Sequence, residues 1–204
     1  MRPTNRRRLA MVLTVLAPLS ARAHHMMDGK VPGSFAQGLL SGLGHPVIGI
    51  DHFVAILAIG VLASLNKRTA VLIAAFFASL LLGVGLHLAR IDLPMAELGV
   101  ALSLVACGSL LLRNGSISLT LSALVFSAAG VFHGYAYGES IVGAELSPLG
   151  AYLLGLVAVQ SAIAFGAGYL FRLAQREDLL RSRRVGSIGG VFTIIVGAAF
   201  AFSA

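Results

Sequence analysis

Apolar stretches separated by short polar connections fill the chain from about residue 47 to its end. Six of them are close to the ~20 residues that an α-helix needs to cross a hydrocarbon core of about 30 Å. They cover residues 47–65, 69–89, 93–112, 117–138, 148–172 and 186–203. This pattern predicts an all-α transmembrane bundle of about six helices, and the short connections predict that consecutive helices are antiparallel neighbours.

A shorter apolar segment, residues 34–44, precedes the first of these stretches. It is too brief to span a bilayer, so it predicts a re-entrant or interfacial half-helix. Three prolines, Pro46, Pro94 and Pro148, stand at expected helix starts, where a missing N–H costs nothing. Since the residue before a proline favours an extended conformation, we expect His45 just before the helix start.

The composition supports the membrane interpretation. Apolar residues make up 57% of the 204 residues and charged residues 11%, against about 45–50% and roughly 25% in soluble domains. A soluble fold of this composition would expose large apolar patches. The sequence therefore predicts a single domain over residues 24–204, with the lipid bilayer as its solvent.

The N-terminus has the pattern of a secretory signal peptide. Residues 6–8 are arginines, residues 9–21 are apolar, and Ala21-Arg22-Ala23 matches an A-x-A cleavage site. We therefore expect residues 1–23 to be removed, although an uncleaved anchor stays possible. In both cases His24 begins on the outer side of the membrane.

The basic residues predict the orientation rather than a nucleic-acid partner. Five of the fifteen leave with the signal peptide, so ten basic and eight acidic residues remain, a net charge of +2. With the N-terminus outside, the inner loops hold Lys67, Arg68, Arg113, Arg172, Arg176, Arg181, Arg183 and Arg184, and the outer segments hold Lys30 and Arg90. This asymmetry follows the positive-inside rule. It predicts a multi-pass membrane protein with both ends of the mature chain on the outer side.

Small residues within the apolar segments predict that the helices pack closely. The single cysteine, Cys107, excludes an internal disulfide and is expected to be a packing residue. Ala158, Ala162 and Gly166 share one helix face at four-residue spacing, which lets backbones approach closely. We expect this stripe to pack inside the bundle, and a homo-oligomer contact is the alternative.

Ionisable side chains inside a bilayer are costly, so their positions are informative. Seven fall at one depth, near the outer ends of four spans: His45, Asp51, His52, His87, Glu97, His133 and Glu139. His24 and His25 follow the cleavage site on the same side. One such residue is ordinarily structural, but the set predicts a cation site. The mixture of imidazole and carboxylate favours a divalent first-row transition metal.

Local spacing suggests how these side chains are arranged. Asp51 lies about 100° from His52 around a helix, so it can ligate or fix the tautomer of a neighbouring histidine. His133 and Tyr137 share a face. Gly134 and Gly138 are expected to loosen the end of that helix and let Glu139 turn inward.

Two runs of residues carry a family resemblance. Residues 45–52, His-Pro-Val-Ile-Gly-Ile-Asp-His, resemble the H-P-x-x-G-x-D-H signature of the HupE/UreJ family of nickel permeases. Residues 132–139 resemble its F-H-G-x-A-x-G-x-E signature, with the glutamate one place earlier. Residues 94–97 are similar to the family's acidic third helix. A signal peptide followed by histidines and six spans is also the family layout.

The resemblance implies that the chain is a transporter and not an enzyme. It implies secondary uptake of nickel from the periplasm across the bacterial inner membrane, as transported substrate and without an organic cofactor, for hydrogenase or urease maturation. His45, Asp51, His52, His133 and Glu139 match the signatures, whereas His87 and Glu97 are assigned from depth alone.

The sequence leaves the metal, the driving force and the class of protein open. Met26 and Met27, which follow the two histidines, favour copper, and cobalt would suit the same ligands. No G-x-x-x-x-G-K-[ST] loop is present, so uptake would follow a metal gradient or be coupled to protons. A membrane metalloenzyme and a periplasm-facing sensor or accessory subunit are the rival classes. Gln160 is the main polar residue near mid-depth, and the inward route is otherwise undefined.

Overall fold

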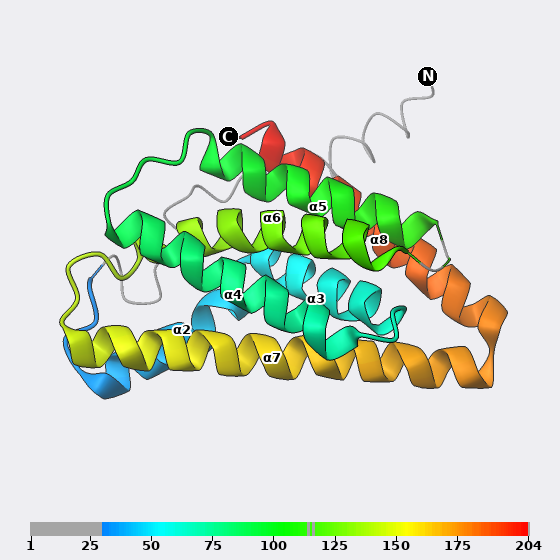
Figure 1. Cartoon of the computed structure of the whole chain (residues 1–204), viewed down its shortest axis with the longest axis horizontal. Coiled ribbons are helices and arrows are strands. Elements are labelled where there is room, and N and C mark those ends of the chain that lie inside the picture. The colour runs from blue at the N-terminus through cyan, green and yellow to red at the C-terminus, as the bar shows by residue number, and fades with distance from the viewer. Residues whose placement is uncertain (1–29, 114, 116, 204) are drawn as a thin grey trace, which may run out of the picture.

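The computed structural model describes residues 30–113, 115 and 117–203, and these form an all-helical bundle (Figure 1). The helices are α2 (Phe35–Ile48), α3 (Ile50–Ser64), α4 (Thr69–Leu88), α5 (Ala96–Leu112), α6 (Leu119–Glu139), α7 (Leu146–Glu177) and α8 (Leu179–Ala201). The signal peptide, His24 and His25 lie outside the described residues, so their assignment stays a prediction.

Four of these helices, α4, α6, α7 and α8, are long and apolar enough to cross a membrane. Helices α2 and α3 pass the same test only together, and they meet at an angle of 80°. Helix α5 is apolar but has only 17 residues. The described residues thus confirm a multi-pass helical membrane protein, with four to five candidate spans by length in place of the six that we expected.

The helix break near the N-terminus lies later than predicted. Helix α2 continues through His45 and Pro46 to Ile48, and the chain becomes extended at Gly49 (φ −72°, ψ 107°). The expectation that His45 precedes the helix start is therefore wrong. The bias against helix before a proline is a local one, and the packing of α2 along α7 overrides it.

The junction between α7 and α8 is also more helical than predicted. We expected a basic loop between residues 172 and 186, but α7 runs on to Glu177 and α8 begins at Leu179. Asp178 alone interrupts them, and its side chain accepts a hydrogen bond from the Arg181 backbone N–H at 2.9 Å. Arginine and glutamate are good helix formers, so the helices extend beyond the apolar span.

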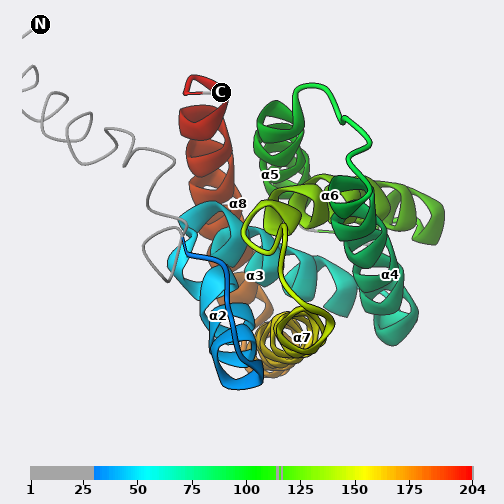
Figure 2. The same cartoon turned by 90° about the vertical axis from the view of Figure 1, so that its left-hand side faces the viewer.

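Three closely packed helix pairs build the bundle: α4 with α6, α2 with α7, and α5 with α8 (Figures 1 and 2). The backbones approach so closely that a Cβ on Gly134 of α6 would collide with the carbonyl oxygen of Leu80 in α4. Glycine is required there because no side chain fits. Cys107, 1% exposed in the core, is a packing residue as predicted.

The small-residue stripe of α7 does not pack inside the bundle. Ala158 and Ala162 are exposed, and Gly166 has no atom within 4 Å of where its Cβ would lie. A different face of the same helix, with Gly155 and Gly168, meets α2 and α3. Our expectation for the stripe is thus wrong, because four-residue spacing identifies a face but not the direction in which it points.

Candidate metal-binding site

A buried polar centre lies where the α2–α3 break meets the end of α6 and the start of α7. His45 comes from the last turn of α2, His52 from the first turn of α3, and His133 from α6. Their side chains are 4%, 4% and 1% exposed. The break at Gly49 is what lets two histidines seven residues apart approach the same partners from two helices of different direction.

One contact of the centre joins two imidazoles. The Nδ1 atoms of His52 and His133 are 2.8 Å apart, and the Nε2 atom of His133 is 3.0 Å from Ser103 Oγ of α5. Ser103 uses its own hydrogen on the Val100 carbonyl oxygen at 2.7 Å, so its oxygen accepts from His133. Neutral His133 therefore carries its proton on Nε2, and its Nδ1 accepts a hydrogen bond from the Nδ1–H of His52.

His45 is held by a second set of hydroxyl groups. Its Nδ1 lies 3.0 Å from the hydroxyl of Tyr152 in α7 and 3.2 Å from Ser140 Oγ at the end of α6. The two hydroxyls are 3.0 Å apart, and both also reach the Tyr137 carbonyl oxygen, at 3.0 and 3.1 Å. A Cβ on Gly42 would collide with the Tyr152 backbone, so this glycine is what allows α2 to bring His45 so close to α7.

Tyr137 lies between the two halves of the centre. Its ring centroid is 4.2 Å from that of His52, at a tilt of 33°, and 5.0 Å from that of His45, nearly perpendicular. His133 and Tyr137 are 1% and 0% exposed, which confirms that they share the inward face of α6. The Tyr137 hydroxyl is buried without a hydrogen-bond partner.

Asp51 adds a carboxylate to this centre. It lies in the first turn of α3, where the helix dipole stabilises negative charge. Its Oδ2 is 3.8 Å from His52 Nδ1, and its Oδ1 is buried with no hydrogen-bond partner. Buried polar atoms are nearly always paired in native proteins, so an orphaned carboxylate oxygen beside His52 fits a position that a cation or its water fills.

The structure does not bring the remaining candidates into this cluster. His87 of α4 is half-buried with its ring 4.5 Å from that of Tyr135, and its Nδ1 has no hydrogen-bond partner. Glu97 at the start of α5 is exposed. Glu139 is exposed too, and α6 stays helical through it, so the expected inward turn is wrong because Gly138 packs tightly on His87 and leaves the helix end regular.

As it stands, the centre is a hydrogen-bonded network rather than a preformed cage. Among residues 30–113, 115 and 117–203, no three or more His, Cys, Asp or Glu side chains are arranged to hold one ion. The neutral partners Ser103, Ser140 and Tyr152 were missed by sequence analysis, which considered ionisable groups alone. Ser140 and Tyr152 lie on either side of the connection between α6 and α7, at the depth of the histidines, and that position was the available signal.

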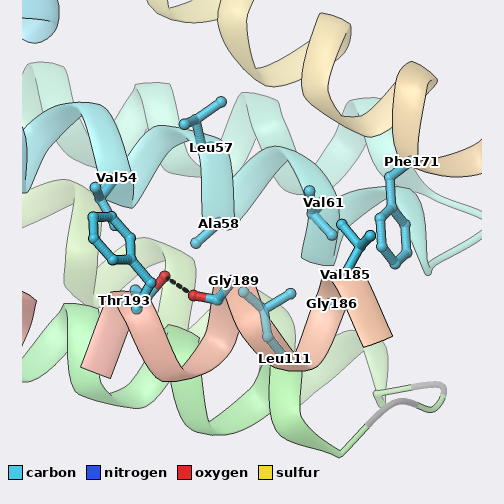
Figure 3. Close-up of a pocket in the computed structure, with 11 residues that line it drawn as sticks. Val54, Leu57, Ala58, Val61, Leu111, Phe171, Val185, Gly186, Gly189 and Thr193 are labelled. Carbon is cyan, nitrogen blue, oxygen red and sulfur yellow. Dashed lines mark hydrogen bonds between the residues drawn. The ribbon is translucent and has the colours of Figure 1, made fainter. Parts of the chain in front are cut away.

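The cleft on the other side of α3 is of a different kind. Residues of α3, α5, α7 and α8 line it, among them Leu57, Leu111, Phe171, Val185 and Thr193 (Figure 3). The hydroxyl of Thr193 donates to the Gly189 carbonyl oxygen at 2.8 Å within its own helix, as the dashed line shows. This lining contains no histidine and no carboxylate.

The fold and the buried centre define a multi-pass helical membrane protein with a histidine-rich polar site near one end of its bundle. Comparison with known proteins identifies the family. The model of the HupE / UreJ protein family matches residues 11–200. Protein HupE of Rhizobium leguminosarum bv. viciae is 30% identical over 174 residues, which is 84% of this chain and 84% of that relative. The chain belongs to the HupE/UreJ family. No solved structure gives a significant match.

Proposed function

We propose that the protein is a secondary permease that takes up a divalent transition-metal ion across the bacterial inner membrane. Nickel is the proposed substrate. The observation that carries the proposal is the pair of Nδ1 atoms of His52 and His133, 2.8 Å apart and buried. Membership of the HupE/UreJ family supports it. The nickel would supply hydrogenase or urease maturation.

The spacing of the imidazole pair suits such an ion. With metal–nitrogen bonds of about 2.0–2.1 Å, two nitrogens at cis positions of a square-planar ion lie about 2.9 Å apart. The pair needs almost no movement to reach this distance, but His52 must shift its proton from Nδ1 to Nε2. Asp51, with its orphaned Oδ1, would supply charge neutralisation or a further ligand.

Nickel, copper and cobalt all accept imidazole and carboxylate ligands, so selectivity depends on geometry. A planar arrangement favours nickel(II) or copper(II) over zinc. His24 and His25, which precede the described residues, would capture the ion from the periplasm. His87, Glu97 and Glu139 remain proposed contributors along the entry side.

The proposed orientation places the histidine centre toward the periplasm. Along α7, Tyr152 at the centre and Arg172 near the other end are separated by about 30 Å of helix. Arg172 donates from Nε to the Ser64 carbonyl oxygen at 2.9 Å, where α3 ends. Basic residues at the end of the bundle opposite the histidines support the positive-inside assignment, with that end in the cytoplasm.

The test is nickel accumulation in cells that express the wild-type chain, His52→Ala or a matched control. Thr193→Ala is a suitable control, because Thr193 is also a buried polar residue but its hydroxyl bonds its own helix. Accumulation that needs the wild-type chain, survives in the control and is lost in His52→Ala is the expected result. Competition by copper and cobalt would then establish the preferred metal.

One outcome would overturn the proposal. If the wild-type chain accumulates no metal above background but binds it when purified, the protein is not a permease. The periplasm-facing sensor or accessory subunit would then be the better explanation.

A further inference from the structure

Gln160 of α7 is a buried polar residue that the histidine network does not use. Its side chain is 1% exposed, and its Nε2 has no hydrogen-bond partner. A buried amide N–H without a hydrogen-bond partner destabilises a fold, whereas an apolar side chain of the same size would not. Orphaned groups of this kind are rare in native proteins and commonly mark a position that a water or an ion occupies.

The packing of α3 on α7 defines which residues face each other. Gly60 of α3 lies against both Ala164 and Gly168 of α7. One turn further along, Arg172 reaches the Ser64 carbonyl oxygen, so residue numbers increase in the same direction along both helices here.

Gln160 lies on α7 between this contact and the histidine centre. It is one turn before Ala164, which meets Gly60 of α3, and one turn after Leu156, whose backbone nitrogen lies against Gly42 of α2. Tyr152, which bonds His45, lies two turns further out on the same buried face of α7. Gln160 is thus about 12 Å further along α7 than the Tyr152 level, on the side that leads to Ser64.

We propose that Gln160 is the first step by which the metal ion leaves the histidine centre toward the cytoplasm, an inference that rests on the permease function above. Its amide oxygen receives the ion from His52, and its Nε2–H holds a water that rehydrates the ion. A neutral amide oxygen is a weak ligand for nickel, so it lowers the barrier without trapping the ion. Conduction requires this combination of affinity and release.

The alternative inward route is less suited to a cation. The cleft between α3 and α8 begins at the level of Val54, but its one polar side chain, Thr193, already donates within its helix (Figure 3). An ion there would lose its hydration without gaining ligands. The α3–α7 side, with Gln160, offers an unsatisfied polar group at the required depth.

The experiment compares binding, transport and stability in Gln160→Leu. The full chain is reconstituted in liposomes that enclose a nickel-sensitive dye, and nickel binding is measured on the purified protein in nanodiscs. We expect the nickel Kd to stay within about twofold of the wild type, while the initial uptake rate falls about tenfold or more. The melting temperature of the metal-free variant should equal or exceed that of the wild type, because an orphaned amide has been removed.

Leu156→Met is the matched control, since it changes the same buried face of α7 one turn away and conserves volume. If Gln160→Leu fails to fold, Gln160→Met provides the same test. Uptake at the wild-type rate in a folded apolar variant overturns the inference and leaves the permease function standing. A proportional loss of binding also overturns it, because Gln160 would then belong to the binding centre. Absence of uptake by the wild type would instead remove the permease function itself.

Discussion

The Nδ1 atom of His52 lies 2.8 Å from the Nδ1 atom of His133, although the two histidines are 81 residues apart in the chain. One of the two nitrogens must donate and the other accept, so the pair has a defined proton arrangement. The hydroxyl of Ser103 selects it, because Ser103 donates to Val100 and accepts from His133. The two rings are therefore oriented by a residue that is not itself expected to bind metal.

The role of Ser103 gives a first prediction. Ser103→Ala removes the acceptor for His133 Nε2–H and leaves that donor buried without a partner. We expect nickel affinity to fall about 10- to 100-fold, as for other groups that orient metal-binding histidines. Calorimetric titration of the purified protein measures this. Ser109→Ala is the control, because Ser109 lies on the same helix, is exposed and bonds its own helix; equal affinities in both variants would refute the role.

Tyr152 gives a second prediction. Tyr152→Phe keeps the ring but removes the hydroxyl that contacts His45 Nδ1, Ser140 and the Tyr137 carbonyl. We expect weaker nickel binding by about tenfold, because His45 loses an orienting contact. Tyr169→Phe, at a residue that is 64% exposed on the same helix, should bind as the wild type does. Unchanged affinity in Tyr152→Phe would show that His45 takes no part in the site.

The pH dependence of binding gives a third prediction. Imidazole binds metal in its neutral form, and its ordinary pKa is about 6.5. Protons therefore compete with the metal, and nickel affinity should be highest at neutral pH and fall as the pH decreases. Affinity that falls at no pH at which the protein stays folded would exclude the histidine centre as the site.

The close approach of α4 and α6 gives a fourth prediction, on stability. In Gly134→Ala the new methyl group would collide with the Leu80 carbonyl oxygen, which is backbone and cannot move without separating the helices. We expect destabilisation of about 1–3 kcal/mol, the usual cost of overpacking. Gly166→Ala meets no atom within 4 Å and should leave the melting temperature unchanged or raise it, because alanine favours a helix more than glycine does. Equal melting temperatures for the two variants would contradict this packing.

Several elements followed from the sequence because their signals are local. The span expected at residues 69–89 matches α4, and the one expected at 117–138 matches α6 to within two residues at each end. The shared face of His133 and Tyr137 was also predictable, since four-residue spacing in a regular helix fixes it. Helix ends were less predictable: α7 continues into polar residues, and α2 runs through Pro46.

The candidate site was predicted in part. Depth along the spans grouped His45, Asp51, His52 and His133, which lie buried near one another, with Glu97 and Glu139, which are exposed. Depth gives the position of a residue along the helix axis. It does not give the direction in which the side chain points around that axis. Neutral hydroxyl groups carry no insertion penalty large enough to reveal them in a sequence, so Tyr152 and Ser103 emerged only from the structure.

The sequence by itself determined that the chain is helical and membrane-embedded, because apolar segment length and the scarcity of charge are sufficient for both. It also determined which residues could bind a metal, since residue type fixes donor chemistry. Only the tertiary structure decided which of them meet. That depends on the 80° bend between α2 and α3 and on the rotation of α6 and α7 against them. Both arise from contacts between segments far apart in the chain, which no local pattern of residues specifies.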